Sequence, residues 1–215
     1  MSPASKRAGP AAFVVGVGNI LWADEGFGVR CAEAFAEKYD AGLDVDIVDG
    51  GTQGLALVNE LADARRVLIF DAVDFDADPG SLIVATGEDV PRFVAGKKVS
   101  LHQTSMMEVL ALAEVLAGGP PEEIALVGCQ PAELEDYGGG LTPQAAAQVA
   151  PAIGAAAAQL AAWGLPVSPR RDAGAPLMPA EVARGSYEDG RPSAQAACRR
   201  GDARVLARSG APGER

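Results

Sequence analysis

The sequence is poor in the residues that most often carry soft-metal or covalent chemistry. Its 215 residues include one histidine, His102, and three cysteines, Cys31, Cys129 and Cys198. An odd number of widely spaced cysteines fits neither a disulfide framework nor a zinc ribbon. We therefore expect reduced thiols, with Cys31 and Cys129 as small core residues.

Long apolar runs and a targeting segment are also missing from the sequence. No apolar stretch reaches the roughly 20 residues that a membrane-spanning helix needs. A basic start followed by an apolar run over 11–22 imitates a secretion signal, but the run leads into Asp24 and Glu25 without a small-x-small cleavage motif. The sequence therefore predicts a cytoplasmic protein with no membrane partner.

Basic residues are scarce relative to acidic ones. The chain has 18 Lys and Arg against 29 Asp and Glu, which gives a net charge of −11. The acidic excess lies before Leu165, and from Leu165 onward basic residues outnumber acidic ones. An acidic body repels phosphate, so we expect no nucleic-acid partner and instead a basic or neutral protein surface.

Apolar periodicity predicts alternating strands and helices. Strand patterns cover 13–18, 43–49, 66–72, 81–86 and 123–129, and helix patterns cover 24–39, 52–64, 101–117 and 142–164. The link of about nine residues after Asp71 is shorter than a parallel crossover, so the fourth strand is expected to be antiparallel. We predict an α/β fold, a three-layer sandwich in which a twisted, mostly parallel five-stranded sheet has helices on both faces.

The predicted organisation is one domain with an extension at each end. Residues 1–11 are polar and are expected to be disordered, and residues 12–164 form the α/β domain. Residues 165–215 are rich in Pro, Gly, Ala and Arg without sustained periodicity. We expect this tail to be loosely ordered or disordered, because such compositions bury little apolar surface.

Three consecutive predicted strands each end in a carboxylate. Asp24 and Glu25 follow the first strand, Asp49 follows the second and Asp71 follows the third. Open α/β sheets bind ligands outside the carboxyl ends of their strands, so these side chains are expected at one edge. Like charges held together cost free energy unless a cation or a proton compensates, and the pattern therefore points to a metal.

His102 is the fourth candidate, at the start of the helix predicted over 101–117. Its imidazole and the carboxylates of Glu25 and Asp71 make a three-ligand set for a divalent transition metal, with positions open to water or substrate. Such a site polarises a carbonyl and lowers the pKa of bound water, as peptide hydrolysis requires. Each residue also has an ordinary explanation: Glu25 favours a helix amino terminus, Asp49 and Asp71 suit turns, and a lone histidine is often a surface residue.

Other catalytic and binding patterns are weaker. Gly16-Val17-Gly18 resembles the start of a dinucleotide fingerprint, but Leu21 occupies the third glycine position and acids follow, so no nucleotide cofactor is expected. No nucleophile elbow of the G-x-S-x-G type is present. A Cys–His pair stays open, although Cys31 and Cys129 lie in apolar element interiors, where a thiol is inert.

Five segments of the sequence together carry a family resemblance. They are, in order, GVGNILWADEGFGVR, DGGTQGL, LIFDAVD, KKVSLHQ and ALVGCQPAELEDYGGGLT, within residues 14–164. They resemble the [NiFe] hydrogenase maturation proteases, most closely the type that serves membrane-bound uptake hydrogenases. The family's metal-reading positions fall on Glu25, Asp71 and His102, and Asp49 matches another acidic position, to which we assign a supporting role.

The resemblance implies an α/β sandwich and an endopeptidase that removes a short carboxy-terminal peptide from the precursor of the [NiFe] hydrogenase large subunit. Cleavage follows nickel insertion, so the nickel belongs to the substrate and the protease supplies ligands that recognise it. Two alternatives use the same three ligands. One is a nickel-sensing maturation chaperone that binds the precursor without cutting it, and the other is a general metallopeptidase that holds its own ion.

Overall fold

The computed structural model describes residues 9–52, 54–91, 106–172 and 176–189. A five-stranded sheet in the order β3-β1-β4-β6-β5 forms its centre. The strands are β1 (Ala12–Val17), β3 (Val45–Gly51), β4 (Arg66–Ala72), β5 (Leu82–Thr86) and β6 (Glu123–Cys129). β5 is antiparallel to β6, and the other neighbours run parallel, so the predicted mostly parallel sheet is confirmed.

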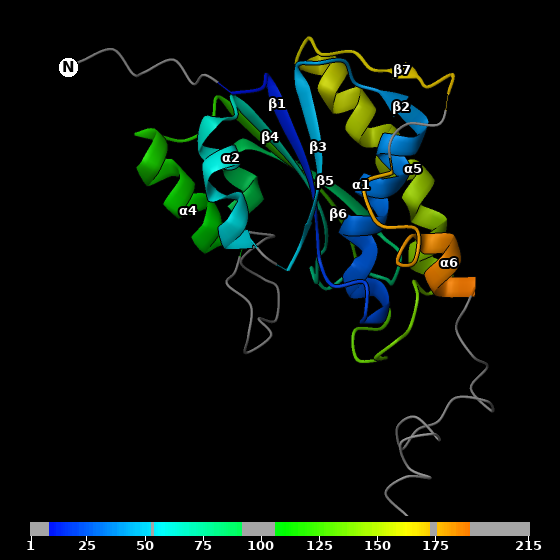
Figure 1. Ribbon diagram of the computed structural model, residues 1–215. Helices are drawn as coiled ribbons and strands as arrows, with labels where there is room; N and C mark the ends of the chain where they lie inside the picture. Colours follow the sequence, from blue (N-terminus) through cyan, green and yellow to red (C-terminus); the bar gives the residue numbers. More distant parts are fainter. Residues whose placement is uncertain (1–8, 53, 92–105, 173–175, 190–215) are drawn as a thin grey trace, which may run out of the picture.

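Helices cover both faces of this sheet (Figure 1). One face packs against α1 (Phe27–Lys38) and α5 (Pro143–Ala162), and the other packs against α2 (Val58–Asp63) and α4 (Met106–Ala117). Short 3-10 turns form η1 (Ala23–Gly26), η2 (Gly54–Leu57) and η3 (Gly87–Asp89), and β2 (Tyr39–Asp40), β7 (Ser168–Pro169) and α6 (Arg184–Asp189) are the remaining elements. The predicted three-layer sandwich is confirmed.

Alternation along the strands divides the core into two clusters. On β4, Leu68 and Phe70 face α1 and α5, whereas Val67 and Ile69 face α2 and α4. All four side chains are buried, as expected for a parallel strand that is covered on both faces. The continuous apolar run of β4 therefore identifies a central strand.

Two helices start later than the sequence pattern predicted. The helix expected from Asp24 begins at Phe27 and is preceded by η1. The helix expected to be capped by Thr52 consists of η2 followed by α2, and α2 has no side-chain cap. Gly26 and Gly54 lie in these two segments, and glycine disfavours regular α-helix, so the chain forms tight turns there first.

The long helix α5 begins as its sequence predicts. The Thr142 hydroxyl oxygen accepts a hydrogen bond from the Ala145 N–H at 3.3 Å, and Pro143 occupies the first helical position. By length and composition alone this helix is apolar enough to cross a membrane, so the prediction that no apolar stretch reaches that length was wrong. One side of α5, which includes Ala152 and Leu160, packs in the core beside α1. Core packing therefore accounts for the apolar residues on that side of the helix.

The chain beyond α5 also contacts the domain. β7 pairs with β2 in antiparallel register. Further along, Met178 is buried, and the Arg30 guanidinium donates a hydrogen bond to the Val182 carbonyl oxygen at 2.9 Å. These contacts place residues 176–189 against α1 (Figure 1). The sequence of this region did not predict these contacts, because they depend on single buried side chains and not on a periodic apolar pattern.

Candidate active site

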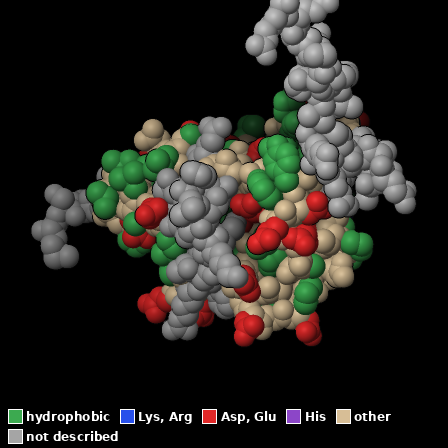
Figure 2. Space-filling model, turned by 90° about the horizontal axis from the view of Figure 1, so that it is seen from below, with side chains coloured by type: hydrophobic (Ala, Val, Ile, Leu, Met, Phe, Trp, Pro, Cys, Tyr) green, Lys and Arg blue, Asp and Glu red, His purple; other side chains and the backbone are tan. Residues whose placement is uncertain are grey.

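The carboxyl edge of the sheet is where the parallel strands end and where the predicted carboxylates were expected. Figure 2 shows the molecule from this side. Among the described side chains in that view, Asp and Glu are prominent, and Lys and Arg are not seen. The edge therefore presents negative charge to an approaching ligand, which favours cationic groups over phosphates.

Three glycines let the start of α1 lie directly on the ends of β1 and β4. A Cβ atom at Gly28 would overlap the Phe70 carbonyl oxygen, and one at Gly16 would overlap the Gly28 carbonyl oxygen. Gly18 has φ of +136°, and a Cβ there would overlap the Glu25 carbonyl oxygen. Only glycine fits so close a backbone approach. The Gly16-Val17-Gly18 motif thus serves chain packing, and nothing in its geometry requires a pyrophosphate.

This packing brings Glu25 and Asp71 to the same edge of the sheet. Glu25 is partly buried in η1, and η1 contacts β4. Asp71 is the next-to-last residue of β4, where it pairs in register with Gly128 and is 1% exposed. Two of the three predicted metal ligands therefore come from separate segments to one end of the molecule.

The third predicted ligand, His102, lies outside the described residues. Met106, the first residue of α4, is buried in the apolar cluster that also holds Ile69 and Val73. These two residues lie two positions before and two positions after Asp71 in the sequence. Asp71 shares their face of the sheet. Within the described part of the chain, no three His, Cys, Asp or Glu side chains are grouped to hold a metal ion. The complete ligand set stays a prediction.

Asp49 lies at the same edge but faces the other layer. It pairs in register with Gly16, and Gly16 pairs with Phe70, which packs against α1. Residues paired across a sheet share one face, so Asp49 points to the α1 side, whereas Asp71 points to the α2 and α4 side. The structure places η1, which carries Glu25, against β4, which carries Asp71, and it separates Asp49 from Asp71 across the sheet.

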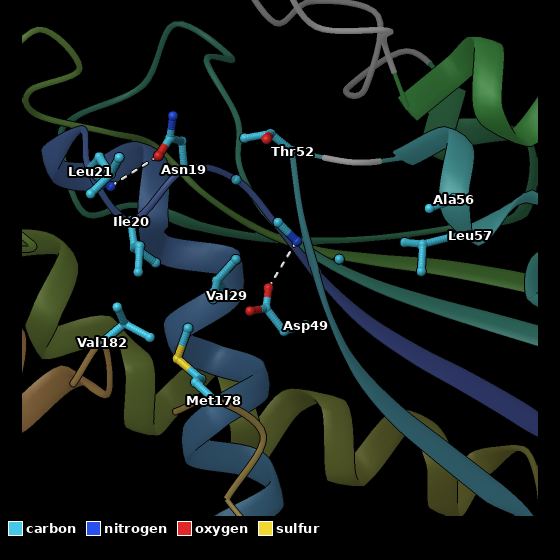
Figure 3. Close-up of a pocket in the computed structure, with 13 residues that line it drawn as sticks. Asn19, Ile20, Leu21, Val29, Asp49, Thr52, Ala56, Leu57, Met178 and Val182 are labelled. Carbon is cyan, nitrogen blue, oxygen red and sulfur yellow. Dashed lines mark hydrogen bonds between the residues drawn. The ribbon is translucent and has the colours of Figure 1, made fainter. Parts of the chain in front are cut away.

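The surroundings of Asp49 support both a turn and a binding role. Its Oδ1 atom accepts a hydrogen bond from the Gly51 N–H at 2.9 Å, as the ordinary turn explanation predicts. Burial raises the pKa of the Asp49 carboxyl above its usual value, although this hydrogen bond and the charge of Arg30 act in the opposite direction. Asp49 also lines a cavity of about 490 Å³ beside η1 (Figure 3).

Asp24, the neighbour of Glu25, has a structural role that the sequence did not reveal. It is fully buried. Its carboxylate accepts hydrogen bonds from the N–H groups of Ala132, Glu133 and Thr142 and from the Thr142 hydroxyl, at 2.7–3.1 Å. Four donors offset the loss of water around a buried carboxylate. The segment after β6 thereby fixes η1 and the backbone that carries Glu25.

Further contacts hold the same turn. The Ala23 N–H donates to the Gly139 carbonyl oxygen at 3.1 Å, and the ring of Trp22 packs edge-on against Tyr137 with centroids 5.1 Å apart. Ala23 has φ of 42°, a left-handed conformation that is uncommon for a residue with a Cβ atom. Such strain persists only where the surroundings determine the conformation. The position of Glu25 is therefore preset by the fold.

The two described cysteines are not candidate nucleophiles. Cys31 and Cys129 are buried in the core layer of α1 and α5. Burial raises the pKa of the Cys31 thiol well above its usual value and that of Cys129 to about 12. Both thiols stay protonated at neutral pH, and a protonated thiol is a poor nucleophile. Their predicted role as core residues is confirmed.

Comparison with known proteins identifies the family. The family model for hydrogenase maturation proteases matches residues 29–159. The chain belongs to the hydrogenase maturation protease family. The model spans the positions of Asp49, Asp71 and His102, and Glu25 lies just before its first matched residue. The resemblance carried by the five sequence segments is thereby confirmed.

Individual relatives support the same assignment. The chain is 49% identical over 193 residues to the hydrogenase expression/formation protein HupD of Rhodobacter capsulatus, which covers 90% of this chain and 91% of that protein. It is 37% identical over 158 residues to the hydrogenase 2 maturation protease of Escherichia coli K12, covering 73% of this chain and 94% of that protein. The solved structure of the hydrogenase maturating endopeptidase HybD from Escherichia coli has a TM-score of 0.68 and 36% identity, and covers 75% of this chain and 99% of that one.

Proposed function

We propose that this protein is the cytoplasmic endopeptidase that removes the carboxy-terminal extension from a [NiFe] hydrogenase large-subunit precursor after nickel insertion. Its membership of the hydrogenase maturation protease family supports the reaction and the partner. The observation that carries the site is the approach of η1, which holds Glu25, to the end of β4, which holds the buried Asp71.

In this proposal the nickel is part of the substrate. Glu25, Asp71 and His102 bind nickel that the precursor already holds, and a mixed set of carboxylate and imidazole ligands suits that ion. The position of α4 supports the third ligand. Met106 lies four residues after His102 and in the layer that Asp71 faces, so the chain between them spans at most about 14 Å.

The chemistry requires an activated water and a polarised carbonyl. The bound nickel aligns the scissile bond, and the attacking water is activated by an edge carboxylate or by the ion. Addition of water across the C–N bond gives the carboxylate of the mature subunit and the free amine of the released peptide. Asp49 has a supporting role at this edge, consistent with a carboxyl whose pKa is raised by burial.

The direct test is processing of a nickel-loaded precursor, followed by its shift on an electrophoretic gel. We expect the wild-type protein to shorten this precursor, to leave a nickel-free precursor intact, and to lose activity in the His102→Ala variant. Asp63→Ala, an exposed change at the far end of α2, is the control and should process normally.

Each other outcome contradicts one part of the proposal. Normal cleavage by His102→Ala, or equal cleavage of the nickel-free precursor, contradicts recognition of nickel by this ligand set. Tight binding of the precursor without shortening by the wild-type protein favours the maturation chaperone. A stoichiometric, tightly held ion in the purified protein favours a general metallopeptidase.

A further inference from the structure

The cavity beside η1, called the edge pocket below, has no role in the reaction described so far. Its volume is about 490 Å³, and its apolar lining comes from four separate parts of the chain. The principal apolar side chains are Ile20, Leu21, Val29, Leu57, Met178 and Val182. Figure 3 shows Asp49 beside this lining, with its hydrogen bond to the Gly51 N–H. A cavity of this size accommodates a ligand larger than one water molecule.

The edge pocket is continuous with the turn that carries Glu25. Ile20 and Leu21, which line it, directly precede the residues that lead into η1. The Leu21 N–H donates to the Asn19 Oδ1 atom at 3.0 Å, so this loop is internally held. A peptide whose scissile bond lies at Glu25 therefore has the edge pocket within reach of a neighbouring side chain, because Ile20 and Leu21 line it.

One wall of the edge pocket comes from outside the family's common core. Met178 and Val182 lie in residues 176–189, beyond Gln159, where the match to the family model ends. This segment packs across α1, and in Figure 3 both side chains lie beside that helix. The wall is thus an addition to the core fold, and its residues belong neither to the sheet nor to η1.

A buried ionic network fixes this wall. The Arg30 guanidinium donates to the Val182 carbonyl oxygen at 2.9 Å, approaches the Met178 sulfur at 3.5 Å and pairs with Glu33 at 2.9 Å. Glu33 accepts a further hydrogen bond from the Arg184 N–H at 2.9 Å. Arg30 and Glu33 are 2% and 6% exposed. Burying such charges is favourable only when several hydrogen bonds satisfy them, so the segment is held in one position.

We propose that the edge pocket is a substrate subsite that binds an apolar side chain of the precursor next to the scissile bond, with Met178 and Val182 as its selective wall. This inference rests on the proposed function. The apolar lining gives the affinity, because burial of an aliphatic side chain is favourable. The wall gives the selectivity, because its position outside the common core lets it differ between proteases that share one reaction.

The test fills the edge pocket and compares the result with a matched change outside it. Val182→Trp places a large ring in the cavity, and Ala180→Trp adds the same ring at an exposed position of the same segment. We expect kcat/KM for the nickel-loaded precursor to fall at least about tenfold in Val182→Trp and to stay near the wild-type value in Ala180→Trp. Thermal unfolding of both variants checks that they are folded.

A second variant tests selectivity without inserting bulk. Val182→Ala only removes atoms from the wall, so it should increase the preference for a large over a small apolar residue beside the scissile bond by about threefold or more. The probe is a pair of nickel-loaded precursors that differ at one residue flanking the cleaved bond, tested on each side in turn.

The outcomes separate the two proposals. Equal kcat/KM for Val182→Trp and Ala180→Trp, or an unchanged preference in Val182→Ala, overturns the subsite while wild-type processing still supports the proposed function. If the wild-type protein does not shorten the precursor, the proposed function fails and the subsite fails with it.

Discussion

The two ends of the central sheet hold their charged residues in different ways. At the amino end, the Arg66 guanidinium forms two ion pairs, with Nε 3.0 Å from Glu123 Oε1 and Nη2 3.6 Å from Glu122 Oε2. Both glutamate side chains are about half exposed. At the carboxyl end, Asp24 and Asp71 are buried, and Asp24 accepts hydrogen bonds from four donors of the chain itself. One end pairs opposite charges in water, and the other positions carboxylates inside the protein.

This difference indicates where function lies. Exposed ion pairs contribute about 0–1 kcal/mol, so the amino end has little effect on stability or activity. A buried carboxylate costs several kcal/mol unless hydrogen bonds or a cation compensate. Asp24 is compensated by its four hydrogen bonds, and Asp71 lies at the edge where α/β sheets bind ligands, where our proposal gives it a nickel ion as partner. We therefore expect changes at the carboxyl end to reduce processing or stability more than changes at the amino end.

The largest effect is expected on processing, at the predicted ligands. Glu25→Gln and Asp71→Asn keep the size of the side chain but remove the charge that a nickel ion requires. We expect single-turnover cleavage of the nickel-loaded precursor to fall on the order of 1,000-fold, equivalent to about 4 kcal/mol. Asp46→Asn, at an exposed position of β3, is the control. Retention of more than a tenth of the wild-type rate would exclude a ligand role.

The next effect is expected on stability, at Asp24. Asp24→Ala leaves the backbone N–H groups of Ala132, Glu133 and Thr142 and the Thr142 hydroxyl without their fully buried acceptor. The free energy of unfolding should fall by about 3 kcal/mol or more, because each lost bond had an ionised acceptor. Urea denaturation followed by circular dichroism measures it, with Asp46→Ala as the control. A loss below about 1 kcal/mol would show that the hydrogen bonds of Asp24 contribute little to holding η1 in place.

A smaller, pH-dependent effect is expected at Asp49. Burial raises the pKa of its carboxyl, so the folded protein keeps the proton to a higher pH than the unfolded chain does. Between the two pKa values stability falls as pH rises, and below the usual pKa of aspartate the effect vanishes. The free energy of unfolding of Asp49→Asn, relative to wild type, should therefore rise from acid to neutral pH. Denaturation curves across this range that show the opposite trend would contradict the burial of Asp49.

The smallest effect is expected at the amino end of the sheet. Arg66→Gln breaks the ion pairs with Glu122 and Glu123 but leaves no charge buried. The free energy of unfolding should change by less than about 1 kcal/mol, and precursor processing should be unchanged. If this variant destabilises the protein as much as Asp24→Ala does, the contrast between the two ends of the sheet does not hold.

Much of the fold could be predicted because its signals are local. The apolar run of β4 indicates a strand covered on both faces, and β6 occupies the predicted range 123–129. The short link before β5 reveals its antiparallel direction, since a parallel crossover needs about a dozen residues. The contacts of residues 176–189 escaped prediction. They depend on the buried Arg30, whose bond to Val182 joins residues 152 positions apart.

The site was predictable only in part. Strand ends give the edge at which Asp49 and Asp71 lie, but not the face, because a shift of one residue in register reverses the side on which a side chain lies. Asp24 has a structural role and its neighbour Glu25 is a proposed ligand, and nothing local in the sequence separates the two. The partners of Asp24 lie 108 to 118 positions away. The glycines around η1 resembled a nucleotide motif because close backbone approach requires glycine in both settings.

The most direct measurement is a crystal structure of the protein soaked with nickel, located by anomalous scattering at the nickel edge. The soaked ion stands in for the nickel that the precursor carries. We predict one ion at the carboxyl edge, bound by one carboxylate oxygen each from Glu25 and Asp71 and by one imidazole nitrogen from His102, at about 2.0–2.2 Å. An ion bound elsewhere, or these three side chains directed to separate faces of the protein, would contradict nickel recognition by this set.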